Sequence, residues 1–197
     1  MKNRAIFLDR DGTINKDVGY PSDFSQIHVY PFSVEAIRDI HRLGFLAVVV
    51  TNQSGIGRGL IPEDALDDIH ERLSGALKRR KAPLDKIYYC PHYIQAAVPK
   101  YRRDCSCRKP KPGMGRKAAA ELDLDLRKSY MIGDKVEDVR FGQAIGATAI
   151  LVLTGFGRRS LAELRKSARP PAHVARNLQT AVRWIARRED RAGRTGA

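Results

Sequence analysis

The chain has 197 residues, and its 36 Lys+Arg against 22 Asp+Glu give a formal net charge of +14. The 43% hydrophobic content excludes a disordered chain, the apolar runs are far shorter than the ~20 residues of a membrane span, and three cysteines cannot form a disulfide framework. With no apolar segment of a signal peptide at its start, we expect a cytoplasmic, monomeric, single-domain protein without a membrane partner.

Short apolar runs rich in β-branched residues alternate with helical patterns along the chain. The runs predict strands at Ala5–Leu8, Leu46–Thr51, Lys86–Tyr89, Tyr130–Ile132 and Thr148–Leu153. Apolar residues at helical spacing predict helices at Val34–Leu43, Pro62–Arg80, Gly115–Leu122, Val136–Ile145, Leu161–Lys166 and Leu178–Arg187. This alternation predicts an α/β fold: one doubly wound, Rossmann-like parallel sheet covered on both faces. We expect the domain to span residues 1–186, followed by a basic, flexible tail at 187–197.

Polar residues follow four of the predicted strands directly. In doubly wound sheets ligands bind beyond the carboxyl ends of the strands, so these segments are the candidate site. They are Asp9–Thr13, Thr51–Gly55, Cys90–His92 and Gly133–Lys135.

Asp9 and Asp11 follow the first strand, and Asp134 follows the fourth. Carboxylates brought together repel each other unless a hard cation or a shared proton relieves them, and Mg²⁺ accepts such ligands while leaving places for phosphate oxygens. One carboxylate could then attack phosphorus while another moves the proton of the leaving oxygen. Thr51 could hydrogen-bond a phosphoryl oxygen, and Lys109 or Lys111 would neutralise its charge. Each residue alone is ordinary, but the ordered set is specific.

All three cysteines fall in one short window together with a histidine. Cys90 and His92 are followed by Cys105 and Cys107, a donor set that satisfies a closed, tetrahedral structural Zn²⁺ site. A basic loop with little apolar content needs something to order it, and a metal at 90–107 would do so. It would also position the next two residues, Arg108 and Lys109, near the carboxylates.

Four ordered motifs together resemble the haloacid-dehalogenase-like (HAD-like) phosphatases over about residues 4–155. The motifs are Asp9-Arg10-Asp11-Gly12-Thr13, Thr51-Asn52, Lys109-Pro110 and Gly133-Asp134-Lys135 with Asp138. The resemblance implies that Asp9 is the nucleophile, Asp11 the general acid/base, and that Thr51 and Lys109 hold the phosphoryl group. It implies a Mg²⁺ ion on the Asp9 side chain, the Asp11 backbone carbonyl and Asp134. It places the lysine role at Lys109 rather than Lys111. No segment is long enough for a cap domain.

The zinc motif, together with Gly19-Tyr20, resembles a narrower family within the histidinol-phosphatase-like branch. This family removes the C7 phosphate of D-glycero-D-manno-heptose 1,7-bisphosphate on the route to ADP- or GDP-heptose and the lipopolysaccharide core. The resemblance implies a phosphorylated sugar as substrate. It also implies the substrate-binding residues Asp17, Gly19, Tyr20, Asn52, Gln53, Ser54, Arg108 and Lys135.

Two alternatives stay open at this point. Histidinol-phosphate phosphatases share the acidic motifs and the zinc loop, but an aminated substrate favours acidic or aromatic groups, whereas the surplus here is cationic. A nucleic-acid-binding module is suggested by the basic segments 100–117 and 158–197, which hold most of the excess charge. The C-terminal part offers only Phe156 and Trp184 as aromatic residues, so we interpret it as a solvated, Arg-rich end and expect no nucleic-acid partner.

Overall fold

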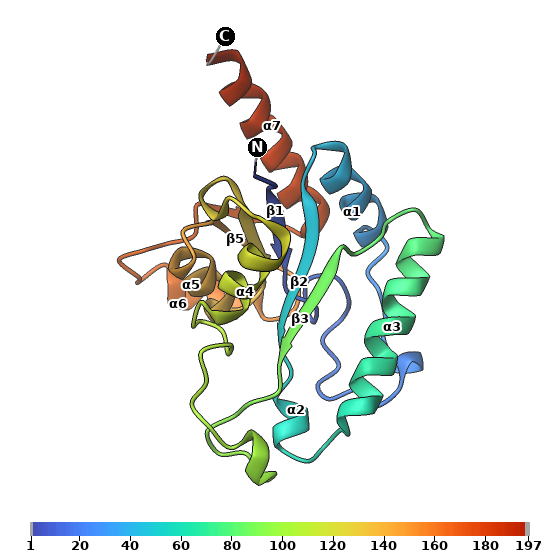
Figure 1. The fold of residues 1–197 in the computed structure, drawn as a ribbon. Coiled ribbons are helices and arrows are strands. Elements are labelled where there is room, and N and C mark those ends of the chain that lie inside the picture. Colours follow the sequence, from blue (N-terminus) through green and yellow to red (C-terminus); the bar gives the residue numbers. More distant parts are fainter. Residues whose placement is uncertain (1, 196–197) are drawn as a thin grey trace.

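A computed structural model describes residues 2–195, with a six-stranded parallel sheet at its centre (Figure 1). The chain leaves the central strand toward one edge and then returns to build the other half, which creates a topological switch point beside that strand. The strands are β1 (Ala5–Leu8), β2 (Leu46–Asn52), β3 (Lys86–Cys90), β4 (Tyr130–Gly133), β5 (Thr148–Val152) and β6 (His173–Ala175). Their order across the sheet is β3-β2-β1-β4-β5-β6, so the switch point lies between β1 and β4.

Helices cover both faces of this sheet, which is why the strands are apolar on both sides. Apolar residues of α1, α3 and α7 pack on one face, and those of α4 and α5 pack on the other, with α6 beside α5. The helices are α1 (Ser33–Arg42), α2 (Ser54–Gly57), α3 (Glu63–Arg79), α4 (Gly113–Leu122), α5 (Val136–Ala144), α6 (Gly157–Leu164) and α7 (Leu178–Thr195). Short 3₁₀ helices occupy Phe24–Gln26, Pro99–Tyr101 and Leu126–Lys128.

The predicted α/β class with one doubly wound parallel sheet is confirmed, and the elements differ in detail: helix α2 was not predicted, and α6 begins at Gly157 rather than at Leu161. The three-residue strand β6 was not predicted, because it is too short to carry a periodic pattern. Helix α7 continues past the predicted helix end at Arg187 as far as Thr195, and residues 196–197 lie outside the described part. The flexibility of the basic segment 187–197 stays a prediction. Glu189 in this continuation pairs with Arg4 and accepts a hydrogen bond from the Tyr130 hydroxyl at 2.6 Å. Figure 1 shows α7 projecting past the end of the sheet next to the N-terminus.

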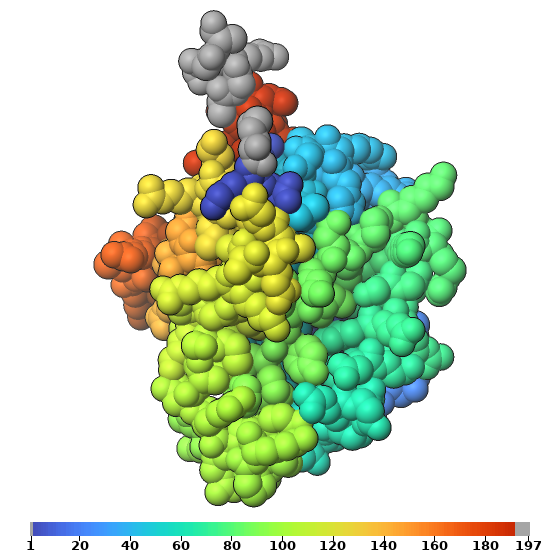
Figure 2. Space-filling view, viewed as in Figure 1, coloured from blue at the N-terminus to red at the C-terminus, as the bar shows by residue number. Residues whose placement is uncertain are grey.

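The long connection between β3 and α4 lies against the segment around α2, as the yellow-green and teal regions of Figure 2 show. A small apolar cluster joins the two segments, formed by Ile56, Ile61, Leu66, Ala96 and Tyr101. Over residues 2–195 no additional domain covers the strand ends, in agreement with the capless arrangement expected from the sequence. In the same range no helix is both long and apolar enough to cross a membrane.

Candidate active site

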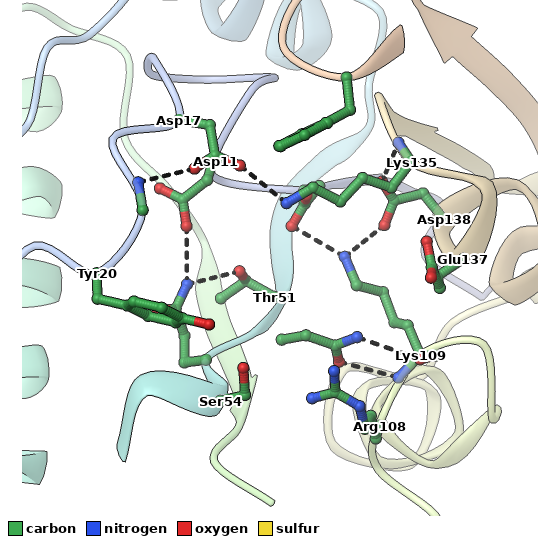
Figure 3. A pocket seen from close by; sticks show the side chains of 15 residues that line it. Asp11, Asp17, Tyr20, Thr51, Ser54, Arg108, Lys109, Lys135, Glu137 and Asp138 are labelled. Atoms are coloured by element: carbon green, nitrogen blue, oxygen red, sulfur yellow. Dashed lines mark hydrogen bonds and ion pairs between the residues drawn. The ribbon is translucent and has the colours of Figure 1, made fainter. Parts of the chain in front are cut away.

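A pocket opens at the carboxyl ends of β1 and β2, beside the switch point (Figure 3). Its walls come from the residues after β1, the end of β2, the segment before α4 and the start of α5. It is lined by Asp9, Asp11, Asp17, Gly19, Tyr20, Thr51, Asn52, Gln53, Ser54, Arg108, Lys109, Lys135, Glu137, Asp138 and Phe156. The structure therefore brings together every residue that the sequence predicted as catalytic or substrate-binding.

Three buried carboxylates meet beneath this pocket. Asp9, Asp134 and Asp138 each offer an oxygen, and these oxygens lie within 4.8 Å of one another. Burial raises the pKa of Asp134 to about 8, and the negative charges of Asp9 and Asp138 add to the effect. The Oδ1 atom of Asp134 is buried without a hydrogen-bond partner in the protein. A set of clustered carboxylate oxygens with one free acceptor fits a hard divalent cation such as Mg²⁺.

Gly12 makes room for this cluster. Its φ of +84° is in the left-handed region, and a Cβ at this position would lie 2.3 Å from Asp134 Oδ2. The Oδ2 atom itself accepts a hydrogen bond from the Phe156 amide at 2.7 Å, which fixes the carboxylate. The glycine in Asp-x-Asp-Gly thus permits β1 and β4 to present their acidic residues side by side.

Lys109 bridges two of the carboxylates from below the pocket. Its Nζ lies 2.9 Å from Asp9 Oδ1 and 2.6 Å from Asp138 Oδ1, and it also donates to the Val50 carbonyl at 2.8 Å. Burial opposes the charge of Lys109, but the carboxylates of Asp138 and Asp9 outweigh it and raise the lysine pKa above its usual value. Lys109 is therefore a buried cation held against the carboxylate proposed to react.

A two-way amide contact holds Lys109 in place. The side chain of Asn52 accepts from the Lys109 amide at 3.0 Å and donates to the Lys109 carbonyl at 3.1 Å. Lys111, the other candidate of the sequence, instead pairs with Asp104 at an exposed position outside the pocket. Of these two lysines, Lys109 is the one that lines the pocket, in keeping with the motif match, and its role stays a prediction.

Asp11 points away from the carboxylate cluster and into a ring of donors. It accepts from Arg10 at 3.0 and 2.8 Å, from Asn15 at 2.9 Å and from Gln53 at 3.0 Å. Burial opposes ionisation of Asp11, but the charge and hydrogen bonds of Arg10 outweigh it and lower the pKa. The Gln53 amide also donates to Thr51 Oγ1 at 2.9 Å, so one side chain connects Asp11 to the threonine of the second motif.

Polar and aromatic groups form the mouth of the pocket. Lys135 Nζ lies 3.0 Å from Asp17 Oδ2 and 5.1 Å from the centre of the Phe156 ring. Arg108 donates from NH1 to the His92 carbonyl at 3.1 Å, which ties this cation to the predicted zinc loop. Tyr20 packs over Gly55, where a Cβ would lie 2.7 Å from the tyrosine ring. The mouth therefore offers two cations, Arg108 and Lys135, and two acidic groups, Asp17 and the exposed Glu137, above the buried cluster.

Cys90, His92, Cys105 and Cys107 form one compact cluster, as predicted. The sulfur atom of Cys107 lies 3.1 Å from that of Cys90, 3.2 Å from that of Cys105 and 3.2 Å from His92 Nδ1. Three thiols and one imidazole converging on one point fit a tetrahedral Zn²⁺ ion with no open position. Arg108 and Lys109 follow this cluster immediately, so whatever fixes Cys107 also fixes these two cations.

Some residues at the site were not assigned a role from the sequence. Asp138 belongs to the fourth motif but was not predicted as a metal ligand. Its spacing of four from Asp134 places it on the first turn of α5, close to the other carboxylates. Arg10 and Asn15 contact Asp11, and His70 contacts Arg10 behind it; none of the three was given a role from the sequence. Asp11 was expected to contribute its backbone carbonyl to Mg²⁺, which stays a prediction.

The chain is similar to proteins of known name along most of its length. It is 45% identical over 152 residues to the D-glycero-beta-D-manno-heptose-1,7-bisphosphate 7-phosphatase of Escherichia coli (strain K12), covering 77% of this chain and 80% of that protein. It is 46% identical over 153 residues to the protein of the same name from Pasteurella multocida (strain Pm70), covering 77% and 83%. The chain belongs to this phosphatase family.

Two further comparisons agree with that assignment. Residues 106–181 match the HAD-hydrolase-like family. The structure of D,D-heptose 1,7-bisphosphate phosphatase from B. bronchiseptica, complexed with magnesium and phosphate, superimposes with a TM-score of 0.82 at 32% identity, covering 94% of this chain and 99% of that one. The protein is thus a HAD-like phosphatase, which is a phosphoric monoester hydrolase. Its site is therefore compared with those of the heptose-bisphosphate phosphatase family.

Proposed function

We propose that the protein removes the C7 phosphate of D-glycero-β-D-manno-heptose 1,7-bisphosphate in a Mg²⁺-dependent reaction through an aspartyl-phosphate. The observation that carries the proposal is the buried contact of Lys109 with Asp9 and Asp138 beside Asp134, at the strand ends of a chain about 45% identical to relatives with that name. The reaction would be a cytoplasmic step toward ADP- or GDP-heptose for lipopolysaccharide.

Asp9, Asp134 and the backbone carbonyl of Asp11 would hold the Mg²⁺ ion. The unpartnered, buried Oδ1 of Asp134 and its raised pKa both support a cation at this point. When bound, Mg²⁺ would neutralise charge on the phosphoryl group and relieve the repulsion between the carboxylates. The B. bronchiseptica phosphatase structure is a complex with magnesium and phosphate, which supports the same ion for this chain.

In the first step, a carboxylate oxygen of Asp9 attacks phosphorus and the bond from phosphorus to the C7 oxygen breaks. Asp11 in its protonated form, the minor form among these donors, gives its proton to that departing oxygen, which leaves as the sugar hydroxyl. Lys109 and Thr51 hold the phosphoryl oxygens, and the lysine, already 2.9 Å from Asp9 Oδ1, compensates the negative charge as it moves.

In the second step, water attacks the phosphorus of the aspartyl-phosphate. Asp11, now a carboxylate, accepts a proton from that water, and the bond from phosphorus to Asp9 breaks to release inorganic phosphate. The carboxylate of Asp9 is restored. The donors around Asp11 favour its ionised form, which suits this second step.

A second phosphate on the substrate explains the cations at the mouth of the pocket. Arg108 and Lys135 lie above the reaction centre, where one ester alone would need only Lys109. Lys111 does not contribute, because it pairs with Asp104 outside the pocket. We propose that the Cys–His cluster binds one structural Zn²⁺ and thereby holds Arg108 over the pocket.

The test is phosphate release in the presence of Mg²⁺ from both anomers of heptose 1,7-bisphosphate, fructose 1,6-bisphosphate, histidinol phosphate and a 3′-phosphorylated oligonucleotide. We expect the β anomer of the heptose to be preferred, with the phosphate at C1 retained in the product. A preference for histidinol phosphate would contradict the substrate and leave the reaction chemistry in place. A preference for the oligonucleotide would contradict both the substrate class and our interpretation of the basic segments.

A further inference from the structure

Arg10 stands between the two aspartates of the first motif, and its guanidinium is fully buried. Its Nε and NH2 atoms donate to the two carboxylate oxygens of Asp11, at 3.0 and 2.8 Å. NH2 also lies 3.3 Å from Gln53 Oε1. The remaining nitrogen, NH1, lies 3.0 Å from Nε2 of His70. The planar group of Arg10 thus connects Asp11 to His70, a side chain sixty residues after Arg10 in the chain.

His70 comes from the middle of α3, and its ring is buried under the site. Burial and the neighbouring Arg10 charge lower the pKa of His70 to about 3, so the ring is neutral and its Nε2 accepts from Arg10. The ring also contacts the Tyr89 ring of β3, with centroids 5.6 Å apart. Tyr89 in turn lies within 3.2 Å of Glu63 at the start of α3. His70 is therefore a fixed acceptor rather than a mobile one.

We propose that His70 is a positioning residue for the proton-transfer step: it orients Arg10, and Arg10 orients Asp11. The inference rests on the proposed role of Asp11 as the general acid. A guanidinium is planar, so hydrogen bonds along one edge to Asp11 and at the opposite corner to His70 fix its rotation. With Arg10 fixed, the plane of the Asp11 carboxylate is fixed as well.

Loss of the His70 acceptor would leave a buried N–H donor of Arg10 without a partner. Such a donor is costly, so the guanidinium would turn toward another acceptor or admit water, and the Asp11 carboxylate would move with it. Proton transfer requires hydrogen-bond reach, and a misplacement of about 1 Å can reduce a rate by about 100-fold. Asp9, Lys109 and Thr51 do not touch His70, so phosphate binding should be preserved.

The test compares His70→Gln with His70→Met. The two side chains have the same length, but only glutamine carries an oxygen that can replace Nε2 as the acceptor. His70→Asn adds the same amide at a shorter reach, and it keeps the comparison available if the methionine variant does not fold. Each is assayed with Mg²⁺ on heptose 1,7-bisphosphate and on p-nitrophenyl phosphate, with inorganic phosphate as a competitive inhibitor.

The ratio of kcat/KM between the two esters is the decisive quantity, because kcat/KM covers only the steps through phosphoryl transfer to the enzyme. The sugar alkoxide needs a proton to leave, whereas nitrophenolate leaves without one. We expect His70→Met and His70→Asn to lose about 10-fold on the sugar ester and less than about 2-fold on the aryl ester. His70→Gln should stay within about 3-fold of wild type on both, and the inhibition constant of phosphate should not change in any variant.

Equal activity of the glutamine, methionine and asparagine variants would overturn the inference, as would an equal loss on the two esters, which indicates a general structural defect. In both cases the proposed function stands if the wild-type protein is active. A wild-type protein inactive on both esters would overturn the proposed function and this inference together.

Discussion

The carboxylates of Asp9 and Asp134 follow two neighbouring strands in the centre of the sheet, whereas Cys105 and Cys107 lie in a connection of irregular structure between β3 and α4. The first pair is placed by strand pairing, with β1 and β4 in register from Ile6 and Tyr130 onward. The second pair lies on irregular backbone, where its side chains pack partly buried against the core that contains Cys90 and Met114. The sheet itself therefore positions the carboxylate site, whereas the thiol site lies in a connection that a bound ion would order.

The two sites therefore differ in their proposed roles: the carboxylate site would take part in the reaction, and the thiol site would position residues for it. An ion at the carboxylates would act on the reacting phosphate but would change the backbone little, because the sheet already holds its ligands. An ion at the thiols would order the loop that carries Arg108 and Lys109 without touching substrate. Substitutions at the carboxylates should therefore lower activity with little loss of stability, whereas substitutions at the thiols should lower both.

The largest effect is expected at the carboxylates. Asp9→Asn removes the proposed nucleophile and should reduce kcat by about 10⁴-fold or more while leaving the thermal unfolding temperature near that of wild type. Asp68→Asn, an exposed position on α3, is the matched control and should behave as wild type. If Asp9→Asn turned over within 10-fold of wild type, Asp9 would not be the nucleophile. That limit corresponds to about 1.4 kcal/mol in activation free energy.

The thiol cluster should give a smaller loss of activity together with a loss of stability. We expect about one Zn²⁺ per chain by metal analysis, none in Cys107→Ser, and about a 10- to 100-fold lower activity in that variant. Its unfolding temperature should fall as well, in contrast to Asp9→Asn. Wild-type protein purified without chelator and free of zinc would refute the structural metal.

A third substitution tests Arg108 separately from the metal-binding loop that precedes it. Arg108→Met leaves all four thiol-cluster ligands in place and should keep the zinc content of wild type. Removing this cation should raise KM for the bisphosphate by about 10-fold, with a much smaller effect on p-nitrophenyl phosphate, which has one phosphate. Equal effects on the two substrates would show that Arg108 does not recognise the second phosphate.

The smallest effect is a pH-dependent stability of the carboxylate cluster. Because the folded-state pKa of Asp134 is raised to about 8 from 3.8, the folded protein binds more protons than the unfolded chain between these values. Without metal, stability should therefore fall as pH rises from about 4 to about 8. Saturating Mg²⁺ should raise the unfolding temperature by about 5 °C or more at pH 8 and by less at pH 5, measured by calorimetry. Asp134→Asn should abolish the difference.

The sequence predicted where the candidate catalytic residues lie in the fold, because the rule for parallel sheets needs only the strand ends. Asp9, Thr51 and Asp134 each follow an apolar run, and the chain order of the motifs fixes which strands carry them. The cysteine spacing likewise predicted its cluster. These motifs and spacings are local in the sequence, so they can be recognised without knowing how the helices and strands pack.

Features that depend on packing between distant elements could not be predicted in this way. The contact of His70 with Arg10 depends on how α3 docks under β1, and an isolated histidine on a helix carries no sign of it. The continuation of α7 was missed because its apolar pattern ends near Ile185, whereas Glu189 is held by Arg4 and Tyr130 from other parts of the chain.

In the proposed reaction Asp9 carries the phosphoryl group during turnover, and chemical trapping can detect that aspartyl-phosphate itself. Enzyme turning over substrate with Mg²⁺ is quenched and treated with borohydride, which reduces an acyl phosphate to an alcohol, and the digested protein is analysed by mass spectrometry. We expect homoserine in place of aspartate at position 9 and unmodified aspartate at position 11. Homoserine at position 11, or at no position in protein caught during turnover, would contradict it.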